Sequence, residues 1–373
     1  MKAVLVLEDG TVLKGRGFGA SGVTVGEVVF TTGMVGYTES LTDPSYKGQI
    51  LVFTYPLIGN YGVPSYTMVD EFNLPLHFES TSIKVEGVVV HEACFTPSHW
   101  ASTKNVNDWL REEGVPGIWG IDTRQLVQKL RERGVMKGAL AVYESNGLEI
   151  NELLERLASF DYGSQKLVEK VSVEETRTIS SKGGKGLIVV IDCGVKLSIV
   201  RALLRKGYDV SLVRYDTPAD KIIDLDPKGV VFSNGPGNPE LYVETVDTAR
   251  ALVEYGLPTL GVCLGHQIVS LAMGAKTFKL RYGHRGVNKP VIDLTSGYCY
   301  MTSQNHGYAV DVESLKSTRL KVWFINADDK TVEGVYSEKG VLCTQFHPEA
   351  SPGPNDTSWV FDYFSKIIEN STD

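Results

Sequence analysis

The sequence of 373 residues is poor in cysteine and has no long apolar run. Its five cysteines are scattered and include no C-x-x-C pair, so the sequence indicates neither a disulfide framework nor a thiolate zinc site. Every apolar stretch is too short for a membrane span, and the apolar start ends at an acidic turn before it reaches signal-sequence length. We therefore expect no membrane association and a reducing, cytoplasmic location.

Positive charge is also in deficit, because 37 Lys and Arg residues face 45 Asp and Glu residues, for a net charge of −8. No basic run offsets this balance, so we expect no nucleic-acid partner and infer small-molecule substrates. The hydrophobic fraction of 42% and the charged fraction of 22% are typical of a globular protein. The length allows two or three domains, each with its own core.

Two short motifs fall short of a ligand site. The glycine-rich segment at residues 183–186 lacks phosphate-loop spacing and precedes a strand, so it is interpreted as linker. His91, Cys94 and His99 lack a fourth ligand in the sequence, so we expect no metal in this chain.

Residues 1–163 are predicted to form a strand-rich α/β domain. A hairpin is indicated around Asp9-Gly10, and helices are expected over residues 106–113 and 123–133, with Asn105 and Asp122 as caps. Residues 164–186 are polar, charged and glycine-ending, which predicts a linker. From residue 187 to residue 373, strand and helix patterns alternate, which predicts a mostly parallel sheet flanked by helices.

The segment Gly261-Val-Cys-Leu-Gly-His-Gln267 lies where an apolar strand turns into a helix. A nucleophile at such a sharp turn needs small residues two positions before and after it, and Gly261 and Gly265 fill these places. The helix N-terminus next to Cys263 favours a thiolate and can stabilise an oxyanion. Taken alone, Cys263 fits equally a small buried core residue.

A cysteine nucleophile needs a base and a group that orients the base. His347 follows an apolar strand, and Pro348 keeps the backbone extended, so Glu349 faces the same side and can reach the imidazole. An exposed His-Pro-Glu turn remains the alternative for this motif. His266 shares the helix with the cysteine and is interpreted as structural.

Two further segments are expected to be loops with hydrogen-bond donors. The segment at residues 234–239 ends a strand, and its glycines let the backbone approach a ligand and complete an oxyanion hole with the amide of Leu264. The segment at residues 303–308 could grip an amino-acid head group. Neither is specific by itself.

These motifs, in this order, resemble those of the class I, or triad-type, glutamine amidotransferases over about residues 187–370. In the N-terminal part, residues 30–46, 54–62 and 120–124 resemble the small-subunit family of carbamoyl phosphate synthetase, which joins a domain of its own to a glutaminase. The resemblance covers nearly the full chain.

The resemblance implies that Cys263 attacks the side-chain amide of L-glutamine, His347 shuttles the proton and Glu349 orients the imidazole. It implies that glutamine is held by Ser45, Gly235, Gly237, Leu264, Gln267, Asn305, Gly307 and Tyr308. It also implies that ammonia passes to a large-subunit partner, which uses ATP and Mg to make carbamoyl phosphate from bicarbonate for arginine and pyrimidine synthesis. No cofactor is expected in this chain.

Two positions depart from the family pattern: Tyr308 replaces a usual Phe, and Ser198 a commoner Asn. Neither touches the expected triad. Two alternatives remain open at this point: a glutaminase that serves a different synthetase, and a regulatory subunit that has lost activity.

Overall fold

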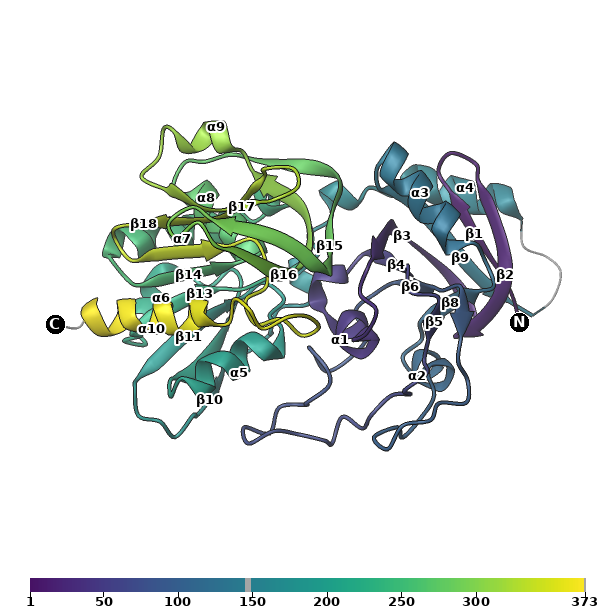
Figure 1. Ribbon diagram of the computed structural model, residues 1–373, viewed down its shortest axis with the longest axis horizontal. Coiled ribbons are helices and arrows are strands. Elements are labelled where there is room, and N and C mark those ends of the chain that lie inside the picture. Colours follow the sequence, from purple (N-terminus) through teal and green to yellow (C-terminus); the bar gives the residue numbers. More distant parts are fainter. Residues whose placement is uncertain (145–148, 372–373) are drawn as a thin grey trace. The chain divides into compact units, whose positions relative to one another are not determined.

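A computed structural model describes residues 1–144 and 149–371, which divide into two compact units (Figure 1). One unit comprises Met1–Asp70 and Pro75–Gln165, and the other comprises Glu71–Leu74 and Lys166–Asp373. Most of residues 164–186, the predicted linker, lies in the second unit, where β10 (Arg177–Ile179) pairs with β12 (Asp209–Arg214). The mixed α/β class is confirmed.

The N-terminal unit is built on a closed barrel. Its strands, in barrel order, are β1 (Lys2–Leu7), β2 (Val12–Gly19), β8 (Pro116–Trp119), β6 (Gly87–Val89), β4 (Gln49–Phe53), β3 (Gly22–Thr31) and β9 (Met136–Tyr143). A separate pair consists of β5 (Leu57–Ile58) and β7 (Glu92–Ala93). The predicted Asp9-Gly10 hairpin joins β1 and β2, which pair antiparallel.

Helices fill the connections of this barrel. They are α1 (Tyr37–Thr42), α2 (Val106–Glu112), α3 (Thr123–Arg133) and α4 (Ile150–Ser159), with 3₁₀ turns at Pro44–Tyr46 and Tyr162–Ser164. The side chain of Asn105 accepts a hydrogen bond from the Asp108 amide, and that of Asp122 accepts one from Gln125, so both predicted caps are confirmed.

The C-terminal unit contains a ten-stranded sheet. Its strands, in spatial order, are β10, β12, β11 (Leu187–Asp192), β13 (Gly229–Phe232), β14 (Thr259–Val262), β19 (Val341–Thr344), β18 (Val332–Ser337), β17 (Lys321–Asn326), β15 (Thr277–Asp293) and β16 (Cys299–Val310). The predicted parallel sheet is found in the centre, from β12 to β19. Antiparallel strands extend it on both sides.

Alternate residues of the central strands pack against helices on opposite faces. Ile188 and Val190 of β11 share a cluster with α5 (Leu197–Arg205) and α10 (Trp359–Ser371). Val189 and Ile191 share another with α6 (Ala219–Ile223), α7 (Val243–Tyr255) and α8 (Leu264–Ala272). This two-sided burial explains why β11 is apolar at every position up to Asp192. The short α9 (Val312–Leu315) and 3₁₀ turns at Val168–Lys170 and Pro239–Leu241 complete the unit.

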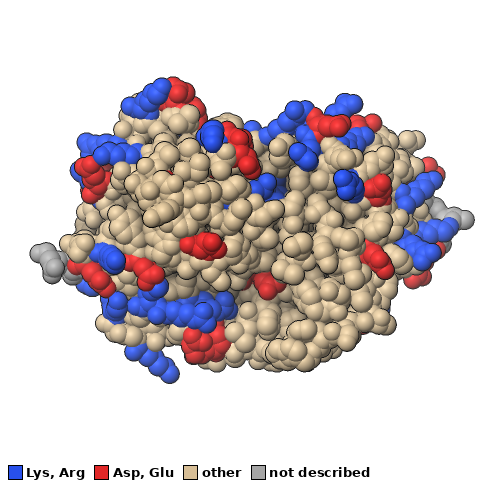
Figure 2. All heavy atoms as spheres, in the orientation of Figure 1, with Lys and Arg blue, Asp and Glu red and all other residues tan. Residues whose placement is uncertain are grey.

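The surface of the C-terminal unit carries paired charges. Lys206 pairs with Asp362, and Lys185 pairs with Glu369. Figure 2 shows basic and acidic residues side by side near α5 and α10. Within residues 1–144 and 149–371, no helix has the length and apolar character needed to cross a membrane.

Candidate active site

Cys263 occupies the sharp turn between β14 and α8. Its φ of 54° and ψ of −103° are strained values for a residue other than glycine. The flanking glycines make the turn possible, because a Cβ on Gly265 would overlap the carbonyl of Phe232, and one on Gly261 would lie 2.8 Å from the Gly265 oxygen. The side chain is buried, and its Sγ lies 3.7 Å from the carbonyl oxygen of Asn305.

His347 leaves the sheet beside Cys263. Strand β19 is the parallel neighbour of β14, with Val262 opposite Thr344, so the residues that follow both strands emerge at the same edge. The amide of His347 donates to the Ser303 carbonyl at 2.9 Å, which ties this segment to β16. Its Nδ1 lies 2.6 Å from Glu349 Oε1, while its Nε2 has no hydrogen-bond partner among the residues described.

Lys196 was missed by the sequence analysis. Its Nζ lies 3.0 Å from Glu349 Oε1, and both side chains are almost completely buried. The Lys196 amide also donates to the Asn234 side chain at 3.0 Å, so the residue is fixed between two predicted site segments. The available signal was a lysine four positions after the end of β11 and directly before the amphipathic helix α5, in an otherwise apolar segment where a buried cation needs a partner.

Charge within this group favours ionised side chains. Burial alone would raise the pKa of Glu349, but the charges of Lys196 and His347 lower it to about 2. Burial would lower the pKa of His347, yet the charge of Glu349 raises it to about 10, with the Cys263 thiol adding to the rise. The site therefore stabilises a positive imidazole, which is the form produced when the ring takes a proton from a thiol.

Most of the residues predicted to hold glutamine surround the turn. A Cβ on Gly235 would lie 2.9 Å from the Leu264 side chain, and Leu264 is the first residue of α8. The Gln267 side chain donates to the Tyr308 carbonyl at 2.9 Å and to Gln345 at 3.0 Å. Gly237, with a φ of 92°, follows β13, and Gly307 lies on β16 between Asn305 and Tyr308.

Ser45, the first of the residues predicted to hold glutamine, belongs to the N-terminal unit. It lies in the 3₁₀ turn at Pro44–Tyr46, and its amide donates to Asp43 Oδ1 at 2.9 Å. The remaining predicted residues belong to the C-terminal unit.

Residues 303–308 form part of β16, so the expected loop is wrong. This segment pairs with β15 through a ladder interrupted by two register shifts. Its polar residues are buried because their partners lie on neighbouring strands, which a local pattern cannot reveal. His266 is fully buried in α8, its ring nitrogens have no partner in the described part of the chain, and burial lowers its pKa to about 3.

Comparison with known proteins finds two families along the chain. The model of "Carbamoyl-phosphate synthase small chain, CPSase domain" matches residues 5–140, and that of "Glutamine amidotransferase class-I" matches residues 189–367.

Curated relatives match over nearly the full length. A carbamoyl phosphate synthase small chain of Pyrococcus furiosus is 50% identical, covering 99% of this chain and 98% of the relative. One of Sulfolobus acidocaldarius is also 50% identical, covering 97% and 95%. One of Methanopyrus kandleri is 49% identical, covering 98% of each.

Proposed function

The chain belongs to the family of carbamoyl phosphate synthase small chains, and from that premise we propose that it hydrolyses L-glutamine through a thioester on Cys263. The observation that carries the proposal is the strained turn that presents Cys263 at the edge where the His347–Glu349 pair emerges. A glutamine amidotransferase of this family needs a nucleophile, a base and a group that orients the base, and Cys263, His347 and Glu349 are suited to these three roles.

The proposed reaction begins from an ion pair, in which the raised pKa of His347 keeps the proton of the Cys263 thiol on Nε2 of the ring and leaves the sulfur as a thiolate. The sulfur attacks the side-chain carbonyl carbon of glutamine and forms a tetrahedral oxyanion. The amide of Leu264, at the N-terminus of α8, and a backbone amide of the Asn234–Pro239 segment are suited to stabilise this charge. His347 then returns the proton to the leaving nitrogen, ammonia departs, and a γ-glutamyl thioester remains.

Hydrolysis of the thioester completes the proposed cycle. His347 takes a proton from a water molecule, whose oxygen attacks the thioester carbonyl, and the thiol is restored as glutamate leaves. Glu349 keeps Nδ1 of the ring protonated, so Nε2 remains the nitrogen that exchanges protons. Lys196 holds Glu349 ionised through both steps.

We further propose that a large chain receives the ammonia. The relatives are named small chains, which implies a larger partner, and ammonia is useful for synthesis only before water protonates it. ATP and Mg would then be used by the partner, and glutamine would be the substrate of this chain, held by the residues predicted above. We place the products in arginine and pyrimidine synthesis.

Glutamine hydrolysis by the purified chain tests this proposal, alone and with a carbamoyl phosphate synthase large chain, ATP and bicarbonate. We expect the partner to stimulate hydrolysis and carbamoyl phosphate to form. Cys263→Ala should abolish glutamine hydrolysis. Cys299→Ala is the matched control and should keep it, because Cys299 is exposed. A rate that the partner leaves unchanged would assign the glutaminase to another synthetase, and no rate under either condition would favour an inactive regulatory subunit.

A further inference from the structure

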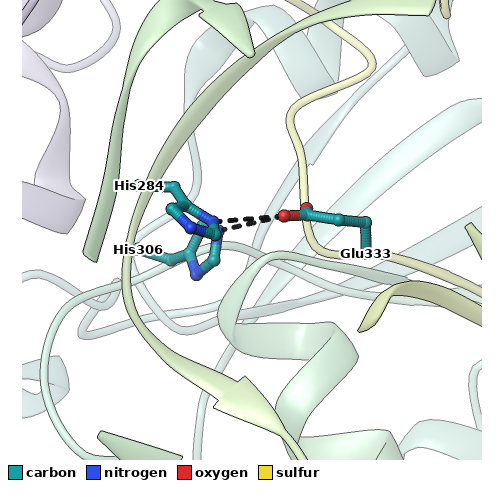
Figure 3. A group of neighbouring side chains, drawn as sticks. All are labelled: His284, His306 and Glu333. Carbon is teal, nitrogen blue, oxygen red and sulfur yellow. Dashed lines mark hydrogen bonds and ion pairs between the residues drawn. The ribbon is translucent and has the colours of Figure 1, made fainter. Parts of the chain in front are cut away.

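A cluster of buried polar side chains lies against the strand that carries Asn305. Figure 3 shows His284 from β15 and His306 from β16 pointing toward the carboxylate of Glu333 on β18. His284 Nδ1 lies 3.2 Å from Glu333 Oε1, and His306 Nε2 lies 3.9 Å from the same oxygen. The Glu333 side chain is fully buried, so its charge requires partners.

The partners of this cluster are protein side chains. Besides His284, the Glu333 carboxylate accepts hydrogen bonds at 3.0 Å from the side chains of Asn326 and Gln304. The second nitrogen of His284 lies 2.8 Å from Asp329 Oδ2. Both nitrogens of His284 thus face carboxylates, which is the pattern of an imidazolium that donates from both nitrogens. A histidine that binds a metal needs one unprotonated nitrogen with a free lone pair.

The charge of His284 agrees with this pattern. Burial alone would lower its pKa, but the hydrogen bonds to Asp329 and Glu333 raise it to about 9. The residues His284, His306 and Glu333 match the ligand types of a divalent metal, yet the carboxylate oxygens of Glu333 are already occupied by donors from three elements. The cluster is an ion pair within a hydrogen-bond network.

The network is connected to the candidate site through main-chain atoms. Gln304 and His306 alternate along β16 with Asn305, whose carbonyl oxygen lies 3.7 Å from Cys263 Sγ. His306 Nδ1 lies 2.8 Å from the Tyr308 carbonyl oxygen, the same atom that accepts from Gln267.

The backbone of Glu333 adds a second connection. Its carbonyl oxygen accepts a hydrogen bond at 2.8 Å from the backbone amide of Gln345, which lies two residues before His347. The network therefore touches both the strand expected to bind glutamine and the segment that carries the expected base.

We propose that Glu333 is a positioning residue for glutamine binding. Its carboxylate oxygens hold the side chains of His284, Gln304 and Asn326 in place. Through Gln304 they also hold the backbone of residues 304–308 in the position in which it would contact glutamine. Glu333 touches neither the substrate nor Cys263. This inference rests on the proposed function, since it assigns a role in the same reaction.

Replacement of Glu333 by leucine tests the role of the accepting oxygens. Glu333→Leu removes the acceptor of one hydrogen bond each from His284, Gln304 and Asn326, so β16 shifts to find other acceptors. We expect the KM for glutamine to rise about tenfold while kcat stays within about threefold, because the contacts of His347 and Glu349 remain. The measurement is steady-state glutamine hydrolysis by the full chain with the large chain present.

Two further variants separate positioning from general damage. Glu333→Gln keeps an accepting oxygen, and the amide of Gln304 can flip to meet its new donor, so we expect KM to return to within about threefold of the original. Glu338→Leu is the surface control, because the Glu338 side chain is 78% exposed and follows the same strand.

The outcomes distinguish this inference from the proposed function. An unaltered chain that hydrolyses no glutamine with its partner would defeat the proposed function itself. If the unaltered chain is active, an unchanged KM in a folded Glu333→Leu variant would overturn the positioning role, as would a Glu333→Gln variant no better than Glu333→Leu. If Glu333→Leu fails to fold, His284→Ala, which removes one donor, replaces it: a raised KM with retained kcat supports the role, and an unchanged KM overturns it.

Discussion

At the scale of single residues, the candidate site depends on a lysine that neutralises a buried carboxylate. In the proposed mechanism Glu349 is ionised and orients His347, and without Lys196 it would be a buried anion facing one imidazole. The triad candidates were predictable from the sequence because each lies in a short motif with its own local geometry. Lys196 was not, because it meets Glu349 across 153 positions of the chain, and no local pattern encodes that contact.

We predict that Lys196→Met shifts the acid limb of the kcat/KM profile upward by about one pH unit or more. The pKa of Glu349, about 2 in the folded chain, rises when the neighbouring cation is removed, so the carboxylate is lost at a higher pH. Lys206→Met, which removes a lysine paired with Asp362 at the surface, is the control. Superimposable profiles for the Lys196 variant and the unaltered chain would contradict the assignment.

The same pair predicts how stability depends on acid. Because folding lowers the pKa of Glu349 from its ordinary 4.5 to about 2, the carboxylate stabilises the fold fully above the ordinary value, and this contribution is lost as the pH falls toward 2. Glu349→Gln removes the contribution. We expect this variant to show a smaller loss of stability between pH 4.5 and pH 2 than the unaltered chain in urea titrations. Equal losses would exclude Glu349 as a source of acid sensitivity.

At the scale of elements, the turn between β14 and α8 was the most predictable feature of the fold. Its strand is apolar, its helix has apolar residues at helical spacing, and two glycines mark the bend. The strands β15 and β16 were less predictable, because buried residues such as Gln304 and His306 have the composition of a loop. Both residues are buried beside Glu333, which lies on another strand.

We predict that Gly265→Ala destabilises the C-terminal unit by about 2 kcal/mol or more, because the added Cβ overlaps the Phe232 carbonyl and the backbone must move. Ser270→Ala, on the same helix, should be neutral or stabilising, since the Ser270 hydroxyl is buried and has no partner among the residues described. Urea unfolding of both variants gives the comparison. Equal stability of the two variants would show that the turn tolerates a side chain at position 265.

At the scale of the whole molecule, the division into units does not follow the order of the sequence completely. In sequence, Leu74 lies between two segments of the N-terminal unit, yet its side chain belongs to a core cluster of the C-terminal unit. The sequence predicts a second domain from residue 187, where the pattern of strands and helices changes. The placement of Leu74 was not predictable, because a single apolar residue in an irregular segment carries no periodicity.

We predict that Leu74→Ala destabilises the C-terminal unit by about 2–5 kcal/mol, as expected for truncation of a buried leucine. Hydrogen exchange should increase in β11 and β12 and remain unchanged in the barrel strands β1 and β9. Leu76→Ala is the control, because Leu76 is 42% exposed. Faster exchange confined to the barrel strands would place Leu74 in the other core.

The central claim is that Cys263 carries the acyl group of glutamine during turnover, and acid quenching followed by mass spectrometry tests it directly. The chain, turning over glutamine with its large-chain partner, is quenched, digested and analysed peptide by peptide. We predict a γ-glutamyl adduct on the peptide that contains Cys263, absent from Cys263→Ala and present in Cys299→Ala. Continued glutamine hydrolysis by Cys263→Ala, or an adduct on a different residue, would contradict the account.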